Sequence, residues 1–475
     1  GNLKLLNESD LISNNKFTIK NGIGISAVNI GIKSTCTIEG YGSIYLNVTN
    51  ISDAFTTGDS KGALKYVVLD NTSTITTPSS VTVDSLLNQS FDIVSTGSIT
   101  SSDTITLLTK QLSNTEVYKY LVVIYVDNAL AGNSVTSATF QGNISADANQ
   151  GKAPVNAVSL ITDLYNNATK TPVTNNSITY QYDTAHNLMK DNAGNIRYYG
   201  ASPNNYIYFN CSDYSNQSSS TCETWRIIGV FDGKVKLIRN ESIGNYAWDN
   251  KNTSTGAESA SGKNDWTEAR LMKLLNPGYE SETTGGSLYY TSGSGNCYAG
   301  QNNATKTCDF TSTGIKNDKT RGLISEETYS LLGWNTSSIY ANEIYEYERS
   351  TGKVYSDRSK EWTGKIALAY PSDYGYAVDL EECVNRQLVD YSDSVCTSNN
   401  WMKTIVNNGS SNAGWLLTPD SGNSDYAWRV YSSGYVNYGN YAYRAYGVVP
   451  VLYLNSELAV KSGTGSSSEP YQLAV

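Results

Sequence analysis

Seven cysteines are the residues of this chain whose type and spacing most directly indicate a chemistry. Structural zinc sites need much closer Cys pairs and usually His, and this chain holds a single His. Local disulfides, which form in oxidising, extracytoplasmic compartments, are therefore the favoured interpretation. The three predicted pairs are Cys211–Cys222, Cys297–Cys308 and Cys383–Cys396. Cys36 is left over, and we expect either a buried thiol or an intermolecular link.

The remaining reactive side chains do not form a recognisable active site. The chain has no phosphate-binding Gly-x-x-x-x-Gly-Lys-[Ser/Thr] loop, no His-Glu-x-x-His and no Gly-x-Ser-x-Gly elbow between a strand and a helix. His186 stands alone in a polar stretch and is interpreted as a surface residue. Four acidic residues could form a carboxylate cluster, although a solvated acidic face near Cys383 is favoured: Asp373, Asp379, Glu381 and Glu382. We expect no enzyme activity, no metal and no cofactor.

The segment between Tyr426 and Tyr446 has the composition of a binding surface. Seven of its 21 positions are Tyr, and most others are Ser, Gly, Asn, Ala and Arg. Tyr supplies a large, rigid contact area, while Ser, Gly and Asn supply adaptable hydrogen bonds. A solvated sheet face is the alternative, because Tyr is frequent in strands and the chain has 37 of them. The predicted ligand-binding residues are Tyr426, Arg429, Tyr431, Ser433, Tyr435, Asn437, Tyr438, Asn440, Tyr441, Tyr443, Arg444 and Tyr446.

The residue types in this segment are those reached by mutating only the adenines of an AAC codon. Such changes never give Lys, Glu, Gln, Met or Trp, and of these five only Trp428 occurs, which we assign to the scaffold. The flanks are Trp415-Leu-Leu-Thr-Pro, Ala427-Trp-x-Val-x-Ser-x-Gly-x-Val and Tyr446-Gly-Val-x-Pro-Val-Leu-Tyr-Leu. This pattern resembles the variable proteins that retroelements diversify at adenines, whose variable region closes a C-type-lectin-like fold related to the formylglycine-generating enzyme. The resemblance covers roughly residues 155–475.

The resemblance implies a binding protein and departs from the family at some positions. Val449 stands where the family has Arg, which removes an Arg-anchored hydrogen bond from the scaffold. The enzymatic relatives oxidise with cysteines that here are expected in local pairs. Calcium-dependent sugar binding is not supported, because neither Thr418-Pro419-Asp420 nor Trp248-Asp249-Asn250 matches the lectin motifs. The final Glu469-Pro470-Tyr471-Gln472-Leu473 is similar to the usual end of the family.

Length and charge set the broad class of protein. A chain of 475 residues predicts two to three domains. Its net charge of −10 argues against nucleic acid as a partner. No apolar run is long enough to span a membrane, and no signal peptide is visible. Residues 1–150 are expected to form one domain and residues 151–475 another, with a linker at Gln150–Pro154.

Residues 1–150 alternate short Val- and Ile-rich runs with polar turns, which predicts an all-β sandwich, immunoglobulin-like or jelly-roll. The C-terminal part of this domain resembles β-sandwich domains of surface and filament proteins in Gram-positive bacteria. The segment Asn2–Ile19 either pairs within its own domain or is a strand exchanged between filament subunits. The expected strands are Ser43–Val48, Tyr66–Leu69, Val81–Val83, Phe91–Val94, Thr104–Leu108, Tyr118–Asp127 and Ser137–Ile144.

Residues 151–475 are expected to form an α+β, C-type-lectin-like domain. Val158, Ile161, Leu164 and Tyr165 predict a short helix. Phe231-Asp-Gly-Lys predicts a hairpin turn. Asp265 is expected to cap a helix that contains Ala269, Leu271, Met272, Leu274 and Leu275 and ends at Asn276-Pro277-Gly278. Ser325 is expected to cap a second helix over Glu326–Leu332. Strands are expected at Ile196–Tyr199, Tyr206–Phe209, Trp225–Phe231, Val235–Arg239, Ile366–Ala369 and Val448–Leu454.

The sequence as a whole predicts an extracellular, surface-displayed ligand-binding protein of the adhesin type. Its ligand would be a protein or glycan on another cell or a phage. The alternative is a structural subunit of an extracellular filament, with self-association by strand exchange and the lectin-like domain as decoration. Neither interpretation names the ligand.

Overall fold

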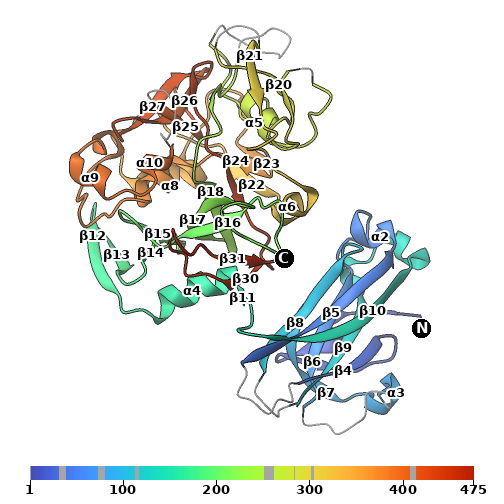
Figure 1. The fold of residues 1–475 in the computed structure, drawn as a ribbon. Coiled ribbons are helices and arrows are strands. Elements are labelled where there is room, and N and C mark those ends of the chain that lie inside the picture. The colour runs from blue at the N-terminus through green and yellow to red at the C-terminus, as the bar shows by residue number, and fades with distance from the viewer. Residues whose placement is uncertain are drawn as a thin grey trace. The chain divides into compact units, whose positions relative to one another are not determined.

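The structure is a computed structural model that describes residues 2–31, 39–72, 81–112, 117–250, 261–282, 284–300, 304–406 and 413–475. The chain divides into two compact units, Gly1–Pro154 and Val155–Val475. Both are mostly β (Figure 1). Cys36 lies outside the described residues.

The first unit contains two β-sheets that share one core. Its elements are β1 (Leu5–Leu6), α1 (Glu8–Leu11), β2 (Ile12–Ser13), β3 (Lys16–Thr18), β4 (Gly24–Gly31), β5 (Gly40–Ile51), α2 (Asp53–Thr56), β6 (Leu64–Asp70), α3 (Val83–Leu86), β7 (Ser90–Ser98), β8 (Thr104–Leu112), β9 (Val117–Asp127), η2 (Asn128–Leu130), η3 (Asn133–Ser137) and β10 (Phe140–Gln150). The larger sheet has the order β1-β9-β6-β7-β3-β2, with β4 also on β9, and the smaller has the order β10-β5-β8.

Strand β9 is buried on both faces, which explains its continuous apolar sequence. Val122 packs with Ile44 of β5 in the core between the two sheets. Leu121 and Val123 face the other way and pack with Phe17 and Leu86, which come from the N-terminal segment and α3. The N-terminal segment is part of its own unit, because β1 pairs with β9 and β3 pairs with β7.

One strand prediction in this unit, Val81–Val83, is wrong, and another, Ser137–Ile144, starts too early. Val83 begins helix α3 because the hydroxyl of Thr82 accepts a hydrogen bond from the Ser85 N–H and forms a capping box. Ser137 ends the 3₁₀-helix η3, and strand β10 starts only at Phe140. In both places the polar side chains close a local turn that competes with the extended conformation.

The second unit combines several sheets with short helices. Its elements are β11 (Val155–Asn156), α4 (Ala157–Asn167), β12 (Thr171–Asn175), β13 (Ile178–Asp183), β14 (Leu188–Lys190), β15 (Ile196–Tyr198), β16 (Tyr206–Phe209), β17 (Glu223–Phe231), β18 (Lys234–Arg239), β19 (Asn245–Ala247), α5 (Arg270–Leu275), β20 (Ser294–Cys297), β21 (Lys306–Asp309), α6 (Asp318–Leu323), β22 (Glu327–Ser330), α7 (Ala341–Glu346), η5 (a π-helix, Tyr347–Thr351), β23 (Glu361–Gly364), β24 (Ile366–Ala367), α8 (Pro371–Tyr376), η6 (Leu388–Asp390), α9 (Ser394–Ser398), α10 (Lys403–Val406), β25 (Ala413–Pro419), β26 (Tyr426–Tyr431), β27 (Val436–Tyr441), β28 (Ala445–Gly447), β29 (Val451–Tyr453), β30 (Ala459–Ser462) and β31 (Gln472–Ala474).

Two larger sheets organise this unit. One has the order β12-β13-β14-β15-β17-β18-β29-β24, with β16 also on β17, and the other has the order β19-β28-β25-β26-β27. The predicted hairpin joins β17 to β18, and Asp232 and Gly233 in its turn both have positive φ, as a type I′ turn requires. The predicted helix after the linker is α4, whose first N–H groups are capped by Asn156.

The two later helix predictions need correction. Glu326–Leu332 is not a helix, because Glu327–Ser330 pairs with β23 as strand β22 and alternates Tyr329 inward with Thr328 outward. The nearby helix α6 comes earlier and is capped by Asn317. Helix α5 is shorter than predicted and starts at Arg270, since Asp265 instead accepts hydrogen bonds from Thr267 in a turn before it.

The three predicted disulfides are confirmed as Cys211–Cys222, Cys297–Cys308 and Cys383–Cys396. Each closes a short loop within the second unit. Their presence fits an oxidising, extracytoplasmic compartment.

Replacing both Cys383 and Cys396 by Ser should lower the free energy of unfolding by about 2–4 kcal/mol, because the open chain regains loop entropy. Denaturant-induced unfolding of the variant and the wild type measures this difference. Equal stabilities would contradict a structural role for this disulfide.

Candidate functional site

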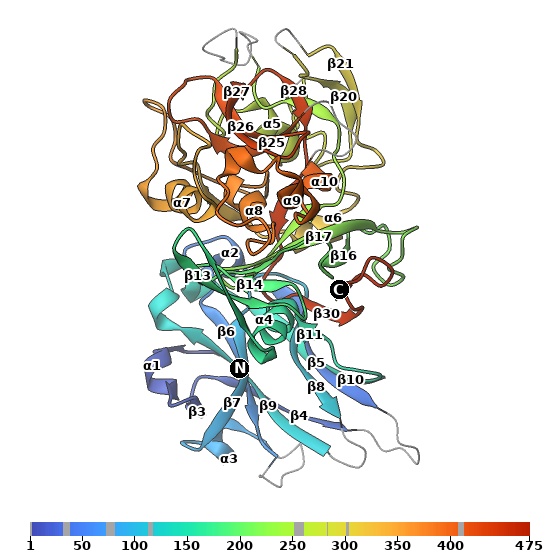
Figure 2. The ribbon, with the colours of Figure 1, turned by 90° about the vertical axis from the view of Figure 1, so that its left-hand side faces the viewer.

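The Tyr-rich segment lies on the five-stranded sheet, directly beside its most buried strand. All seven residues of β25 are buried, and β25 pairs with β26 on one side and with β28 on the other. Figure 2 shows β25, β26, β27 and β28 side by side at the upper end of the second unit. The indole N–H of Trp415 donates to the Tyr246 carbonyl at 3.0 Å, and that of Trp428 donates to the Trp334 carbonyl at 3.2 Å. Both indoles are buried. Together with β25 they support the Tyr-rich segment, and we call this support the frame.

The structure brings the predicted ligand-binding residues together on β26, β27, β28 and the turns between them. Ser433, Tyr441 and Arg444 are exposed, and Arg429 is buried with 8% exposure. The others are half-exposed: Tyr426, Tyr431, Tyr435, Asn437, Tyr438, Asn440, Tyr443 and Tyr446. The aromatic rings of this segment are therefore neither fully buried nor free in solvent.

Several tyrosine rings of the segment contact one another in two groups. Tyr431 and Tyr435 are stacked, with ring centroids 5.0 Å apart. Tyr441 meets Tyr426 edge-on at 4.9 Å and stacks on Tyr443 at 5.7 Å. Such pairs restrict the rings before any ligand arrives, which lowers the entropy cost of binding.

Two of the tyrosines also pack against the frame. The ring of Tyr438 lies edge-on to Trp428 at 6.5 Å, and that of Tyr446 lies edge-on to Trp415 at 4.8 Å. Their half-exposed rings join the core to the surface. Substituting Tyr438 or Tyr446 would therefore affect folding as well as binding.

Arg429 is held between two tyrosines. Its guanidinium lies 4.6 Å from the Tyr431 ring centroid and 4.9 Å from that of Tyr446, and its Nη1 donates to the Tyr446 hydroxyl. The buried Nε of Arg429 has no hydrogen-bond partner among the described residues. Asn440 Nδ2 also donates to the Tyr446 hydroxyl, at 3.0 Å. Arg429 thus positions the rings, whereas the exposed Arg444 lies at the surface beside Tyr443.

Asn264 closes the turn between β25 and β26, a role that no sequence pattern predicted. Its Nδ2 lies 2.9 Å from the carbonyl oxygen of Asp420, 2.7 Å from that of Asn423 and 2.8 Å from that of Tyr426. Arg358 Nε donates to its Oδ1 at 3.2 Å. One buried amide thus satisfies carbonyl groups that converge at the start of the Tyr-rich segment. An Asn in a polar loop carries no pattern that would single it out.

Asp249 holds the other end of the segment. Its N–H donates to the carbonyl of Ala442 at 3.1 Å, and its carboxylate accepts from the N–H groups of Lys263 at 2.7 Å and Arg270 at 3.1 Å. Burial raises the pKa of Asp249 to about 6, and these backbone hydrogen bonds only partly offset it. The folded chain therefore takes up a proton at a higher pH than the unfolded chain does.

This pKa shift predicts a pH-dependent contribution to stability. The contribution of Asp249 is fully present below its unfolded pKa of about 4 and is lost as the pH rises through 6. The unfolding free energy of the wild type, minus that of Asp249→Asn, should be larger at about pH 5 than at about pH 7.5. Denaturant titrations of both proteins at the two pH values measure it. A difference independent of pH would contradict the shift.

The suggested acidic face near Cys383 is wrong for Asp373. Glu381 and Glu382 are exposed, but Asp373 is buried in an ion-pair network. It accepts from Lys236 Nζ and from Arg197 Nη1, the latter at 3.2 Å.

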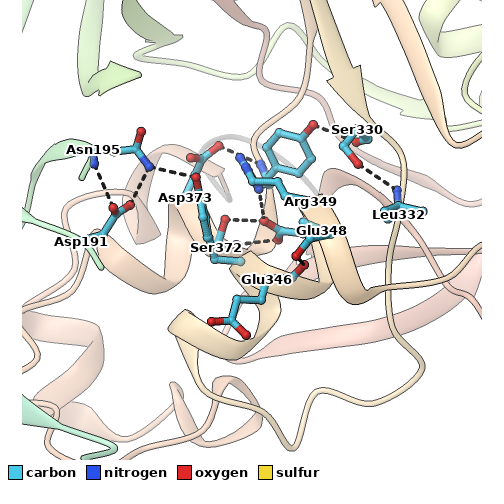
Figure 3. A network of polar contacts seen from close by, with 12 residues as sticks. Asp191, Asn195, Ser330, Leu332, Glu346, Glu348, Arg349, Ser372 and Asp373 are labelled. Atoms are coloured by element: carbon cyan, nitrogen blue, oxygen red, sulfur yellow. Dashed lines mark hydrogen bonds and ion pairs between the residues drawn. The ribbon is translucent and has the colours of Figure 1, made fainter. Parts of the chain in front are cut away.

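The network continues on both sides of Asp373, and Figure 3 shows Asp373 together with Asp191, Ser372, Glu348 and Arg349. Arg197 Nε donates to Asp191 at 2.7 Å. On the other side Glu348, also buried, accepts from Ser372 and from Arg349.

The network is balanced in charge and joins separate elements. Burial lowers the pKa of Lys236 to about 8, although the negative charge of Asp373 opposes this. Lys236 and Arg197 in turn hold the pKa of Asp373 below its ordinary value against the effect of burial. Each charged group faces an opposite charge, so the arrangement ties β15, β18 and α8 together. The ion-pair network could not be predicted from the sequence, because its members are far apart in the chain.

Removing one partner should leave an unmatched buried charge. Lys236→Met is expected to lower the free energy of unfolding by about 3–5 kcal/mol. The matched control is Lys263→Met, whose Nζ pairs with the largely exposed Glu268, and it should cost at most about 1 kcal/mol. Urea unfolding of both variants tests the contrast, and similar losses would contradict it.

His186 is half-exposed, and its Nδ1 lies 2.7 Å from Asp183 Oδ2. With Leu160 and Leu164 of α4 it lines an open cavity of about 260 Å³.

Within the described ranges, no three His, Cys, Asp or Glu side chains come together in a way that could hold a metal ion. No helix among the described residues is long and apolar enough to cross a membrane.

Comparison with known proteins gives no match among family models, curated proteins or solved structures.

Proposed function

We propose that this chain is an extracellular, surface-displayed binding protein of the adhesin type, and that Tyr426–Tyr446 is its ligand-contacting surface. The observation that carries the proposal is the position of the segment. Its tyrosines are half-exposed, or exposed in the case of Tyr441, on β26, β27, β28 and their turns, in the same sheet as the fully buried β25, so the rings are accessible on a rigid support. Tyr and Arg dominate binding hot spots in protein interfaces.

In this proposal the second unit is a C-type-lectin-like domain, and the first is a β-sandwich that carries it. Two cores lie on opposite sides of the five-stranded sheet. Trp415 and Leu417 of β25 belong to one core, and Leu416 belongs to the other. The frame is thus fixed without help from the exposed rings. A segment supported in this way tolerates changes of sequence, as diversification at adenines would require.

The ligand class in this proposal is a protein or glycan on another cell or a phage. Nucleic acid is disfavoured by the net charge of −10. A covalent reaction has no support in the segment, whose polar side chains carry hydroxyl, amide, guanidinium and indole groups and no carboxylate or thiol. The surface is suited to contact and hydrogen bonding.

A display library tests this proposal without knowledge of the natural ligand. Tyr431, Ser433, Tyr435, Asn437 and Tyr443 are randomised together, and folded members are selected for binding to hen egg-white lysozyme. The control library randomises five exposed positions on a different sheet of the same unit, namely Thr171, Thr174, Thr179, Gln181 and Lys190. The first library should yield binders and the second should not. Equal yields would contradict a specialised surface.

Binders from the library allow a direct test of the tyrosines. Replacing the rings at three of the non-frame positions by Ala, for example Tyr431, Tyr435 and Tyr443 where a binder retains them, should weaken binding by at least about 100-fold. The melting temperature should stay within about 2 °C of the parent, because the ring contacts found with Trp415 and Trp428 among the described residues of the segment are those of Tyr446 and Tyr438. A large fall in melting temperature would show that the rings belong to the core.

A further inference from the structure

Strand β10 is an edge strand of the first unit, and β4 approaches it without pairing with it. It pairs with β5 along its whole length and is the terminal strand of the order β10-β5-β8. In Figure 1 it is the outer long strand beside β5. No second strand pairs with it within the described residues of the chain. One row of main-chain N–H and C=O groups along its 11 residues therefore lacks a ladder partner.

The sequence of β10 carries little of the usual protection of an edge strand. Natural edges are blocked by Lys, Pro, shortness or bulges, because an unblocked edge pairs with other strands. From Phe140 to Gln150 the strand has no Lys or Pro, and Asp147 is its one charged residue. Its bulge lies near one end, between Gln141 and Gly142. Most of the strand is straight enough to accept a neighbour.

The two faces of β10 differ, and one is incompletely covered. Asn143 and Ser145 lie on the polar face, where both interact with Asn47. Ile144 and Ala146 lie opposite the core residues Leu46 and Ile44, on the apolar face. Ile144 is only half-buried, and both Ala146 and Ala148 are exposed. A further strand beside β10 would cover this apolar row.

The strand is complementary to itself when it pairs antiparallel about Ser145. In this register Asp147 lies opposite Asn143 of the second strand, which can donate to its carboxylate. Ile144 lies opposite Ala146 on the apolar face, and the two Ser145 residues face each other. A register centred on Asp147 would instead oppose two carboxylates, which is unfavourable. The charge pattern therefore favours the register about Ser145 over the one centred on Asp147.

We propose that two copies of this chain associate through β10, antiparallel and about a two-fold axis, so that the two three-stranded sheets become one sheet of six strands. Such an interface is closed and gives a dimer, not an open filament. The dimer carries two Tyr-rich surfaces, which allows bivalent attachment to a repetitive target. Dimerisation itself does not depend on the proposed binding function.

Sedimentation equilibrium of the full chain tests the proposal. The wild type should approach twice the chain mass of 51.7 kDa as its concentration rises. Ser145→Lys places two like charges face to face and should raise the dimer dissociation constant at least about tenfold. Ser145→Glu should do the same, and a mixture of the two variants should form the heterodimer. The control Ser102→Lys, at an exposed position between β7 and β8, should dimerise like the wild type.

Each outcome decides the proposal. A wild type that keeps the monomer mass at every concentration overturns it. A Ser145→Lys variant that dimerises normally, or a Lys and Glu mixture that stays monomeric, overturns the register about Ser145. Unchanged melting temperatures of the variants exclude unfolding as the cause, and hydrogen exchange should slow in β10 only where the dimer forms.

Discussion

The burial of β25 on both faces is the constraint on which the candidate site depends. A strand buried on both sides must be apolar throughout and must be covered by two cores, and Trp415-Leu416-Leu417 meets this condition. Of its neighbours, β26 is buried between its half-exposed end residues Tyr426 and Tyr431, and β28 brings the chain back from the surface to the buried Gly447. The Tyr-rich segment is anchored to both cores by buried residues such as Trp428, Val436 and Ala442, and the tyrosine side chains between them remain at least partly exposed.

Buried polar and charged side chains hold this frame in place at points where apolar packing alone would not. Asn264 and Asp249 hold the two ends of the segment through main-chain groups. The ion pairs around Asp373 join elements that are distant in sequence. All of these groups are buried, so each is costly if it loses its partner. The rigidity of the frame is therefore concentrated below the surface, while the surface itself consists of tyrosine rings in mutual contact.

The features that the sequence predicted correctly are those encoded locally. Cysteines separated by short polar loops predicted the disulfides, Asp232-Gly233 predicted the hairpin, and the spacing of Val158, Ile161 and Leu164 predicted α4. The features that it missed depend on tertiary context. Asp373 looked like part of an acidic surface, since nothing nearby in the chain shows that Lys236 and Arg197 reach it. The strand at Glu327–Ser330 was missed because Ser325 and Gly333 have the types that bound a helix, whereas pairing with β23 decides the conformation.

The central claim is that the frame fixes the fold and that the exposed rings do not. Measuring the folded amount of every single substitution between Trp415 and Leu454, with the chain displayed on yeast and probed by protease resistance, tests it most directly. The account predicts wide tolerance at Tyr431, Ser433, Tyr435 and Tyr443, and loss of folded protein for nearly every substitution of Trp415, Trp428 or Val451. Intolerance at the four surface positions equal to that at the tryptophans would contradict it.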